Sequence, residues 1–125
     1  MSNPRFVIQE HFARTHHYDF RLEKDGVFKS WVLRKSFTHS PSIRRLAIQV
    51  DDHDLGFGSF EGEISRGRYG AGKIRIWDNG EYIATRWDAN RITFQLLGSK
   101  VSGRYSLIRF KRAGPRSWLL IKHQE

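Results

Sequence analysis

Three side chains of metal-ligand type occur close together near the start of the chain. They are His11, His17 and Asp19, in the spacing His-x5-His-x-Asp. Imidazole nitrogens and carboxylate oxygens bind divalent transition metals, and three protein ligands leave positions open for water or substrate. The chain contains no cysteine, so a transition-metal site in it must use histidine and carboxylate. The spacing therefore predicts a catalytic metal site.

The segment from residue 16 to 23 alternates between polar and apolar residues, as a half-buried β-strand does. Successive side chains in a strand point to opposite faces, so His17, Asp19, Arg21 and Glu23 share one face. The same alternation turns His16 away from the predicted site. Charged residues also alternate in this way on an ordinary solvent-facing sheet, and the pattern alone leaves that alternative open.

Further polar residues fit a phosphate bound at such a metal. His53 lies among carboxylates in the segment Asp51–Asp54, which should favour its protonated form. It could be a surface histidine, a fourth ligand, a phosphate donor or a general acid. The cations Arg21, Lys35 and Arg45 lie in or beside the early strands and could neutralise phosphate oxygens. Taken singly, each also fits an exposed charge.

A glycine-rich segment, Gly67–Lys73, has the G-x4-G-K spacing of a phosphate-binding loop. Ile74 stands where Ser or Thr would bind magnesium, and a strand-like run follows instead of a helix. We therefore expect a tight connection between strands here, not a nucleotide site.

The elements that must position these residues are short strands separated by turns. The runs are Arg5–Gln9, His16–Glu23, Val27–Leu33, Leu46–Val50, Glu61–Ile64, Lys73–Trp77, Glu81–Trp87, Arg91–Leu97, Ser102–Phe110 and Ser117–Lys122. Lys24-Asp25-Gly26 and Asp78-Asn79-Gly80 predict hairpin turns. With no long helix indicated, the strands predict an all-β barrel or sandwich.

Length and charge bound the function. The 125 residues fit one domain, and the net charge of +9 with a pI of about 10.4 favours a polyanionic partner, most commonly nucleic acid. We see no apolar run long enough to span a membrane and no basic amphipathic stretch. The first residues lack the pattern of a signal peptide, so we expect a cytoplasmic protein.

The ordered motifs of this chain resemble those of the 3′-phosphoesterase domain of bacterial DNA ligase D and its free-standing relatives. The matching segments run nearly end to end. They are Phe6–His11, His17–Glu23, Asp25–Val27 with Ser30-Trp31, Arg45–Ala47, Val50–His53, Phe60–Ile64, Tyr69–Gly72, Trp77–Gly80 and Trp118–Lys122. Nothing is left over for a ligase or polymerase domain, so the chain resembles the free-standing form, a single 3′-phosphoesterase domain over residues 1–125.

The resemblance implies a compact β-barrel of about eight strands, with short loops and an active site in a groove on its outer surface. Members of the family use manganese to heal 3′ ends of a DNA primer–template during end joining. They remove a 3′-terminal ribonucleoside and then the remaining 3′-phosphate, which leaves a 3′-hydroxyl. A separate DNA ligase and polymerase would then be partners, and zinc or cobalt could also occupy the metal site.

Residue by residue, the resemblance assigns His11, His17 and Asp19 to the metal. It places Gln9, Arg21, Lys35, Arg45 and His53 around the reacting phosphate, with Glu23 in a supporting role. Phe57 departs from the family, which usually has Tyr there, so one phosphate-binding hydroxyl is missing and the balance between the two activities is open.

Two other functions compete with this interpretation. His17, Asp19 and His53 also match the two-histidine, one-carboxylate ligand set of iron oxygenases. That assignment would leave His11 without a role. A non-catalytic nucleic-acid-binding β-barrel would explain the charge and make the histidines ordinary surface residues.

Overall fold

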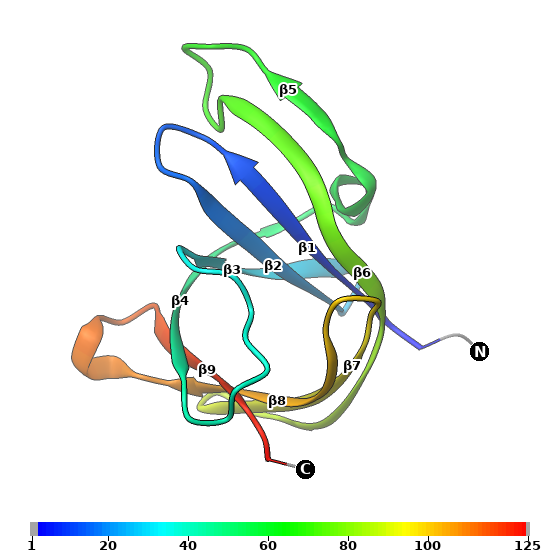
Figure 1. Cartoon of the computed structure of the whole chain (residues 1–125), viewed down its shortest axis with the longest axis vertical. Helices are drawn as coiled ribbons and strands as arrows, with labels where there is room; N and C mark the ends of the chain where they lie inside the picture. The colour runs from blue at the N-terminus through cyan, green and yellow to red at the C-terminus, as the bar shows by residue number, and fades with distance from the viewer. Residues whose placement is uncertain (1–2, 125) are drawn as a thin grey trace.

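The computed structural model describes residues 3–124 and arranges them as one antiparallel sheet of nine strands (Figure 1). The strands are β1 (Arg5–Phe12), β2 (His17–Lys24), β3 (Val27–Leu33), β4 (Arg44–His53), β5 (Gly62–Ile64), β6 (Gly72–Trp87), β7 (Arg91–Leu97), β8 (Ser102–Arg109) and β9 (Ser117–Lys122). Two short 3-10 helices, η1 (Leu55–Ser59) and η2 (Lys111–Ala113), lie in connections. No helix within residues 3–124 has the length and apolar character needed to cross a membrane.

The sheet closes into a barrel. The strand order is β1-β2-β3-β4-β9-β8-β7-β6, and β1 also pairs with β6, so eight strands form a ring. β5 pairs only with β6, outside this ring. The predicted all-β barrel of about eight strands is confirmed, and the ring closes where β1 pairs with β6.

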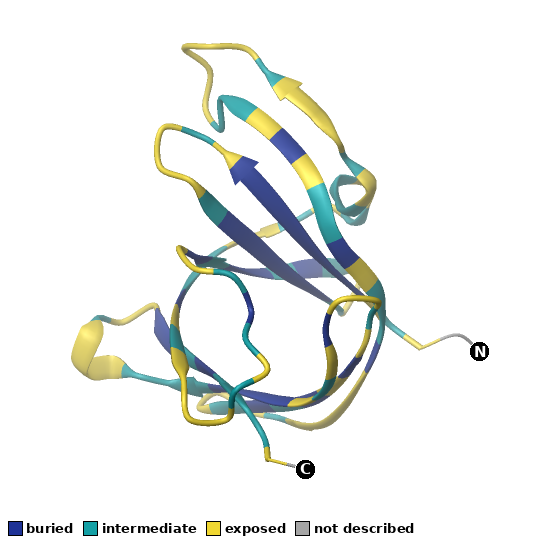
Figure 2. Ribbon diagram, viewed as in Figure 1, coloured by how far each residue is buried: buried dark blue, intermediate teal, exposed yellow. Residues whose placement is uncertain are grey.

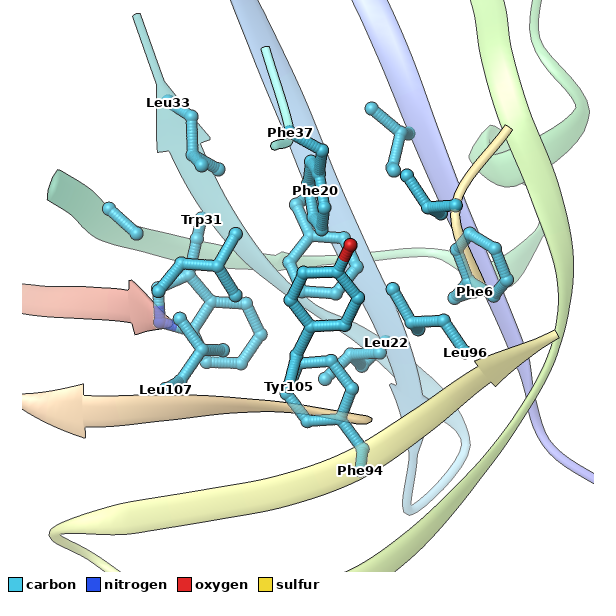
Figure 3. Close-up of a cluster of buried hydrophobic side chains, with 14 of the residues drawn as sticks. Phe6, Phe20, Leu22, Trp31, Leu33, Phe37, Phe94, Leu96, Tyr105 and Leu107 are labelled. Atoms are coloured by element: carbon cyan, nitrogen blue, oxygen red, sulfur yellow. The ribbon is translucent and has the colours of Figure 1, made fainter. Parts of the chain in front are cut away.

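The inner faces of the strands form one apolar core (Figure 3). Phe20 and Leu22 point inward from β2, and they meet Trp31 from β3 and Phe94 from β7. These side chains are fully buried. Burial of each stabilises the fold by about 1.5–3 kcal/mol, and the alternation predicted for residues 16–23 places them there.

The two predicted hairpin turns have different outcomes. The turn after β2 is confirmed: Asp25 and Gly26 have φ values of 54° and 81°, which suits a tight two-residue connection to β3. The turn at Asp78-Asn79-Gly80 is wrong, because β6 runs through it without a break. The pairing of β6 with β1 shifts register between Ile8 and Gln9, so the strand bulges there instead of reversing.

Long-range contacts explain why the strand continues at this point. Asp78 is buried, and its carboxylate accepts backbone N–H groups from Ser99, Lys100 and Val101 at 2.8–3.1 Å, so it anchors the turn between β7 and β8. At Gly80 an added Cβ would collide with the backbone of β7. Both residues resemble turn residues, but here they serve strand packing.

The outer face of β1 and β2 is covered as well as the inner face. All six residues between the ends of β1 are buried, and β2 is buried through most of its length (Figure 2). β7, by contrast, alternates between buried and exposed residues. Since alternation is the usual pattern where one sheet face meets solvent, something must lie over the outside of β1 and β2.

Two segments provide that cover. The η1 segment follows β4 and is bonded to β1, as described below, and the segment before β6 reaches the same face at Ala71, whose carbonyl oxygen lies 3.2 Å from His11 Nε2. β5 and the start of β6 extend beyond the barrel beside the loop between β1 and β2 (Figure 1). Residues 65–71 join these two strands, which confirms that the glycine-rich segment is a tight connection between strands.

Candidate metal centre

His11, His17 and Asp19 converge on the outer face of β1 and β2. His11 lies directly opposite His17 across the two strands, and Asp19 follows His17 on the same face. His17 Nε2 is 3.4 Å and His11 Nδ1 is 3.8 Å from Asp19 Oδ2. One potential ligand atom from each residue lies within 4.8 Å of the others. The structure therefore contains a possible three-residue metal-binding cluster.

The hydrogen bonds of the two histidines set their tautomers. His11 Nε2 lies 3.2 Å from the carbonyl oxygen of Ala71, and His17 Nδ1 lies 2.9 Å from that of Thr15. A carbonyl oxygen only accepts, so each of these nitrogens carries the proton in the neutral ring. The opposite nitrogens, which face Asp19, keep their lone pairs. This is the arrangement in which proteins hold metal-ligating histidines, and the donor set fits a divalent cation.

Without a metal, the cluster favours protonation of His17. A hydrogen bond with Asp19 raises the pKa of His17, against the opposing effect of burial. Burial alone would raise the pKa of Asp19, but the hydrogen bond with His17 and the charge of Arg21 outweigh it and lower that pKa. Asp19 is thus an anion at neutral pH, and a cation bound here would compete with protonation of His17.

Arg21 brings a buried positive charge to the same face. Its Nε donates to Gln9 Oε1 at 2.7 Å and its Nη1 to Ser30 Oγ at 2.8 Å. Nη2 lies 3.8 Å from Asp19 Oδ2, too far for a hydrogen bond. Burial lowers the pKa of Arg21, yet a guanidinium stays charged in proteins. The Nη2 group can therefore donate to an anion held beside the cluster.

Gln9 ties the η1 segment to the barrel. It is fully buried, and its Nε2 donates to the carbonyl oxygens of Phe57 at 2.9 Å and Phe60 at 3.1 Å. The Phe57 ring lies 5.0 Å from the guanidinium of Arg21 and 5.4 Å from the ring of His53. The residue that replaces the expected tyrosine thus borders the same space as Arg21 and His53.

His53 ends β4 near this space, but its expected charge is wrong. Its Nδ1 lies 3.0 Å from the carbonyl oxygen of Asp51. Burial, followed by the positive charge of Arg21, lowers the pKa of His53, and these effects outweigh the nearby carboxylates of Asp19 and Asp51. His53 is therefore neutral at pH 7 without a ligand, and it lies outside the group of converging ligand atoms.

Three residues assigned from the sequence are not joined to the cluster by a contact in the structure. Arg45 Nε donates to the carbonyl oxygen of Ser36 at 2.9 Å, and Lys35 is exposed in the adjoining loop. Glu23 lies at the other end of β2, where its carboxylate accepts the backbone N–H of Arg5 at 2.9 Å. Glu23 therefore fixes the start of β1 and lies away from the cluster of His11, His17 and Asp19.

His16 lies outside the cluster, as the alternation predicts. Its Nε2 is 2.8 Å from Glu10 Oε2, and Arg75 binds the other oxygen of the same carboxylate. These residues form a separate ion-paired group. His16 and His17 are adjacent in sequence but have different partners, which makes them a matched pair for mutagenesis.

Sequence reasoning missed several supporting groups. Ser30 lies opposite Arg21 in the pairing of β2 with β3, so the predicted hairpin register could have identified it. The carbonyl groups of Thr15, Ala71 and Phe60 leave no signal in the sequence, because every residue carries one. Their roles depend on how the chain folds back over β1.

Comparisons with known proteins give one consistent result. A family model described as the DNA Ligase D 3′-phosphoesterase domain matches residues 9–109. A multifunctional non-homologous end joining protein LigD of Mycobacterium bovis is 48% identical over 108 residues, which are 83% of this chain and 14% of that protein. The protein of the same name from Pseudomonas aeruginosa is 42% identical over 127 residues, covering 97% of this chain and 15% of the relative.

Proposed function

The chain belongs to the DNA ligase D 3′-phosphoesterase domain family, and from this membership we propose that it is a metal-dependent phosphoesterase that heals the 3′ ends of DNA. It removes a 3′-terminal ribonucleoside, and then removes the remaining 3′-phosphate to leave a 3′-hydroxyl. The observation that carries the proposal is the convergence of His11 Nδ1, His17 Nε2 and an Asp19 oxygen beside the buried Arg21.

The three converging residues would hold the metal, for which we propose Mn²⁺. The donor set of two imidazoles and one carboxylate also suits Zn²⁺ or Co²⁺, so the choice of manganese follows the family resemblance. The bound cation would supply Lewis acidity to the phosphate and to the attacking hydroxyl group. The carbonyl groups of Ala71 and Thr15 keep both imidazoles in the ligating tautomer.

Arg21 would bind the non-bridging oxygens of the reacting phosphate through its Nη2 group. Its other bonds, to Gln9 and Ser30, hold the guanidinium in place before substrate arrives, so little reorganisation is needed as charge builds up. Lys35 and Arg45 add positive charge to the substrate-binding surface in this proposal. Glu23 supports the site indirectly, because it holds the start of β1.

His53 would handle the proton on the leaving oxygen. Its Nδ1 donates to the carbonyl oxygen of Asp51, which leaves Nε2 as the exchanging atom. The ring is neutral without ligand, but an incoming phosphate anion favours proton uptake at Nε2. As water or a hydroxyl attacks phosphorus, the P–O bond to the leaving nucleoside breaks and Nε2 gives its proton to that oxygen.

The substrate in this proposal is a DNA primer–template with a 3′ ribonucleotide or a 3′-phosphate. The net charge of +9 favours such a polyanion. The chain spans about one seventh of the length of the curated relatives it matches, which are named as multifunctional end-joining proteins. We propose that it serves end joining with a DNA ligase and a polymerase, in the cytoplasm.

One assay tests the proposal directly. A labelled primer–template with a single 3′ ribonucleotide is incubated with and without Mn²⁺, and the products are resolved by end group. We expect Mn²⁺-dependent conversion to a 3′-phosphate and then a 3′-hydroxyl. His17→Ala and Asp19→Asn should reduce conversion to background, whereas the adjacent His16→Ala should retain it. Salt-sensitive DNA binding that ignores chelators, with no product formed, would instead identify a non-catalytic binder.

A further inference from the structure

Tyr69 is the most exposed large hydrophobic side chain in the described part of the chain. Its relative exposure is 101%, whereas the other exposed large hydrophobic residues lie between 39% and 47%. Single exposed apolar residues are common on protein surfaces, but they usually keep part of their area against the fold. A tyrosine ring held wholly in solvent is available to a partner on both of its faces.

The backbone is built to present this ring. Residues 65–71 form two consecutive turns, closed by hydrogen bonds from Arg68 N to Ser65 O at 3.2 Å and from Ala71 N to Arg68 O at 3.1 Å. Tyr69 is the second residue of the later turn, and Gly70 follows with a φ of 76°, as a type II turn requires. The ring therefore projects from a defined turn at the tip of the β5–β6 hairpin.

The same tip is bonded to the metal centre. The carbonyl oxygen of Ala71 lies 3.2 Å from His11 Nε2, and Tyr69 is only two residues away. Two residues span at most about 7–8 Å between Cα atoms. A nucleotide whose phosphate is held at the metal centre therefore has its base or its neighbour's base within reach of the Tyr69 ring.

Both charged residues of the two turns, residues 65–71, are arginines, and Glu63 of β5 lies opposite Lys73 of β6. Arg66 and Arg68 are exposed on the same turns, and neither forms an ion pair within residues 3–124. Lys73 is exposed at the start of β6. Aromatic rings flanked by arginine or lysine are the usual platform for single-stranded nucleic acid, because the ring stacks on a base while the cations bind the backbone.

We propose that Tyr69 stacks on the unpaired base next to the scissile phosphate, and that Arg66 and Arg68 bind the adjoining backbone phosphates. The site favours a frayed or single-stranded 3′ end, since an unpaired last base is free to leave the stack and place its face on the ring. This inference rests on the proposed function, because it takes the reacting phosphate to lie at the metal centre. The two can nevertheless fail separately.

The first test measures stacking without turnover. A single-stranded DNA with 2-aminopurine at a 3′-hydroxyl end is the reaction product, so it is bound but not cleaved, and stacking quenches its fluorescence. With Mn²⁺ present, we expect wild type and Tyr69→Phe to quench it. Tyr69→Ala should bind about five- to a hundred-fold more weakly and lose the quenching. Ile83→Ala, a partly exposed apolar residue on β6, is the matched control and should behave as wild type.

A second set of variants tests the contribution of Arg66 and Arg68 to DNA binding. Arg66→Ala combined with Arg68→Ala should weaken binding at every sequence and reduce its salt dependence, while Arg112→Ala, an exposed arginine in η2, should change neither. Binding and quenching by Tyr69→Ala equal to wild type would overturn the inference, and so would an unchanged salt slope in the double variant.

Activity separates the two proposals. If wild type shows Tyr69-dependent quenching but releases no product from the 3′-ribonucleotide primer, the proposed function fails and the stacking site stands. If wild type is active and Tyr69→Ala keeps the same KM and the same quenching, the stacking site fails and the function stands. A wild type that neither binds nor cleaves overturns both.

Discussion

The β1–β2 and β7–β8 hairpins form two walls of the same barrel, and their outer faces differ in burial. On the inner side both contribute apolar residues to one core, such as Phe20 from β2 and Phe94 from β7. On the outer side, β7 alternates in the ordinary way and Gln95 is exposed. On β1, the corresponding kind of residue, Gln9, is fully buried.

The difference lies in polar side chains that are buried on the outer face of β1 and β2, where an apolar residue would not need a hydrogen-bond partner. A polar side chain buried on the outer face must find partners, since an unmet hydrogen bond there is costly. Gln9, Arg21 and Ser30 meet that need in a connected network beneath η1. On the outer face of β7 and β8, a chain of hydrogen bonds runs from Thr93 through Ser106 to His123, while Gln95 is exposed. Our proposal places the active site on this outer face of β1 and β2, which is buried and polar.

The largest loss of stability should come from substitutions on the inner faces, where both walls contribute apolar residues to the same core. Phe20→Ala and Phe94→Ala each leave a cavity in the shared core, so each should lower the free energy of unfolding by about 3–5 kcal/mol. Urea denaturation with linear extrapolation measures this. A loss below about 1 kcal/mol for either variant would contradict the view that both inner faces belong to one core.

Two glutamines, Gln9 on β1 and Gln95 on β7, allow a matched test of the outer faces, where the two walls differ. Gln9→Leu strands the buried Nε of Arg21 and releases η1, so we expect a loss of about 1–3 kcal/mol in stability. We also expect activity to fall about 10–100-fold, as when a supporting residue of a metal site is removed. Gln95→Leu should change stability by less than about 0.5 kcal/mol and leave activity unchanged. Equal effects would remove the distinction between the walls.

The protonation of His17, on the outer face of β2, should make Mn²⁺ binding depend on pH. The pKa of His17 is raised above its ordinary value of 6.5, and metal binding needs the neutral ring. Mn²⁺ affinity should therefore fall as pH decreases through that raised pKa, by about tenfold per pH unit below it. Asp19, with its lowered pKa, stays ionised over this range. Titration of free Mn²⁺ by electron paramagnetic resonance measures the slope, and a flat profile between pH 5 and about 8 would contradict proton competition at His17.

The smallest effect should come from Phe57, whose ring lies beside Arg21 and His53 but has no group that could form a hydrogen bond. Phe57→Tyr adds a hydroxyl near Arg21 and His53, and a neutral hydrogen bond to the phosphate is worth about 0.5–1.5 kcal/mol. The rate of at least one of the two cleavage steps should rise about 2–10-fold, with Mn²⁺ affinity unchanged. Separate assays on 3′-ribonucleotide and 3′-phosphate primers measure the two rates. If Phe57→Tyr has the same rate as wild type in both steps, a hydroxyl at this position makes no contribution to cleavage.

Local patterns in the sequence were sufficient for most of the strands and for one face of the candidate site, but not for β6, which was predicted as two strands. The period-two alternation of residues 17–23 put the apolar side chains in the core and His17, Asp19 and Arg21 together outside, because a strand fixes which side each residue faces. The same argument correctly separated His16 from His17. The all-β barrel followed from strand spacing together with the family resemblance.

Only the tertiary structure decided the rest, because it depends on residues far apart in the chain. Asp78 and Gly80 have the residue types of a hairpin turn, but bonds to residues 99–101 and contact with β7 keep β6 extended. His53 sits among carboxylates in sequence, yet burial and Arg21 lower its pKa. The tautomer of His11 is set by the carbonyl group of Ala71, which lies sixty residues away in the chain. The sequence therefore determined which residue types are available, and the fold determined their partners and their charge.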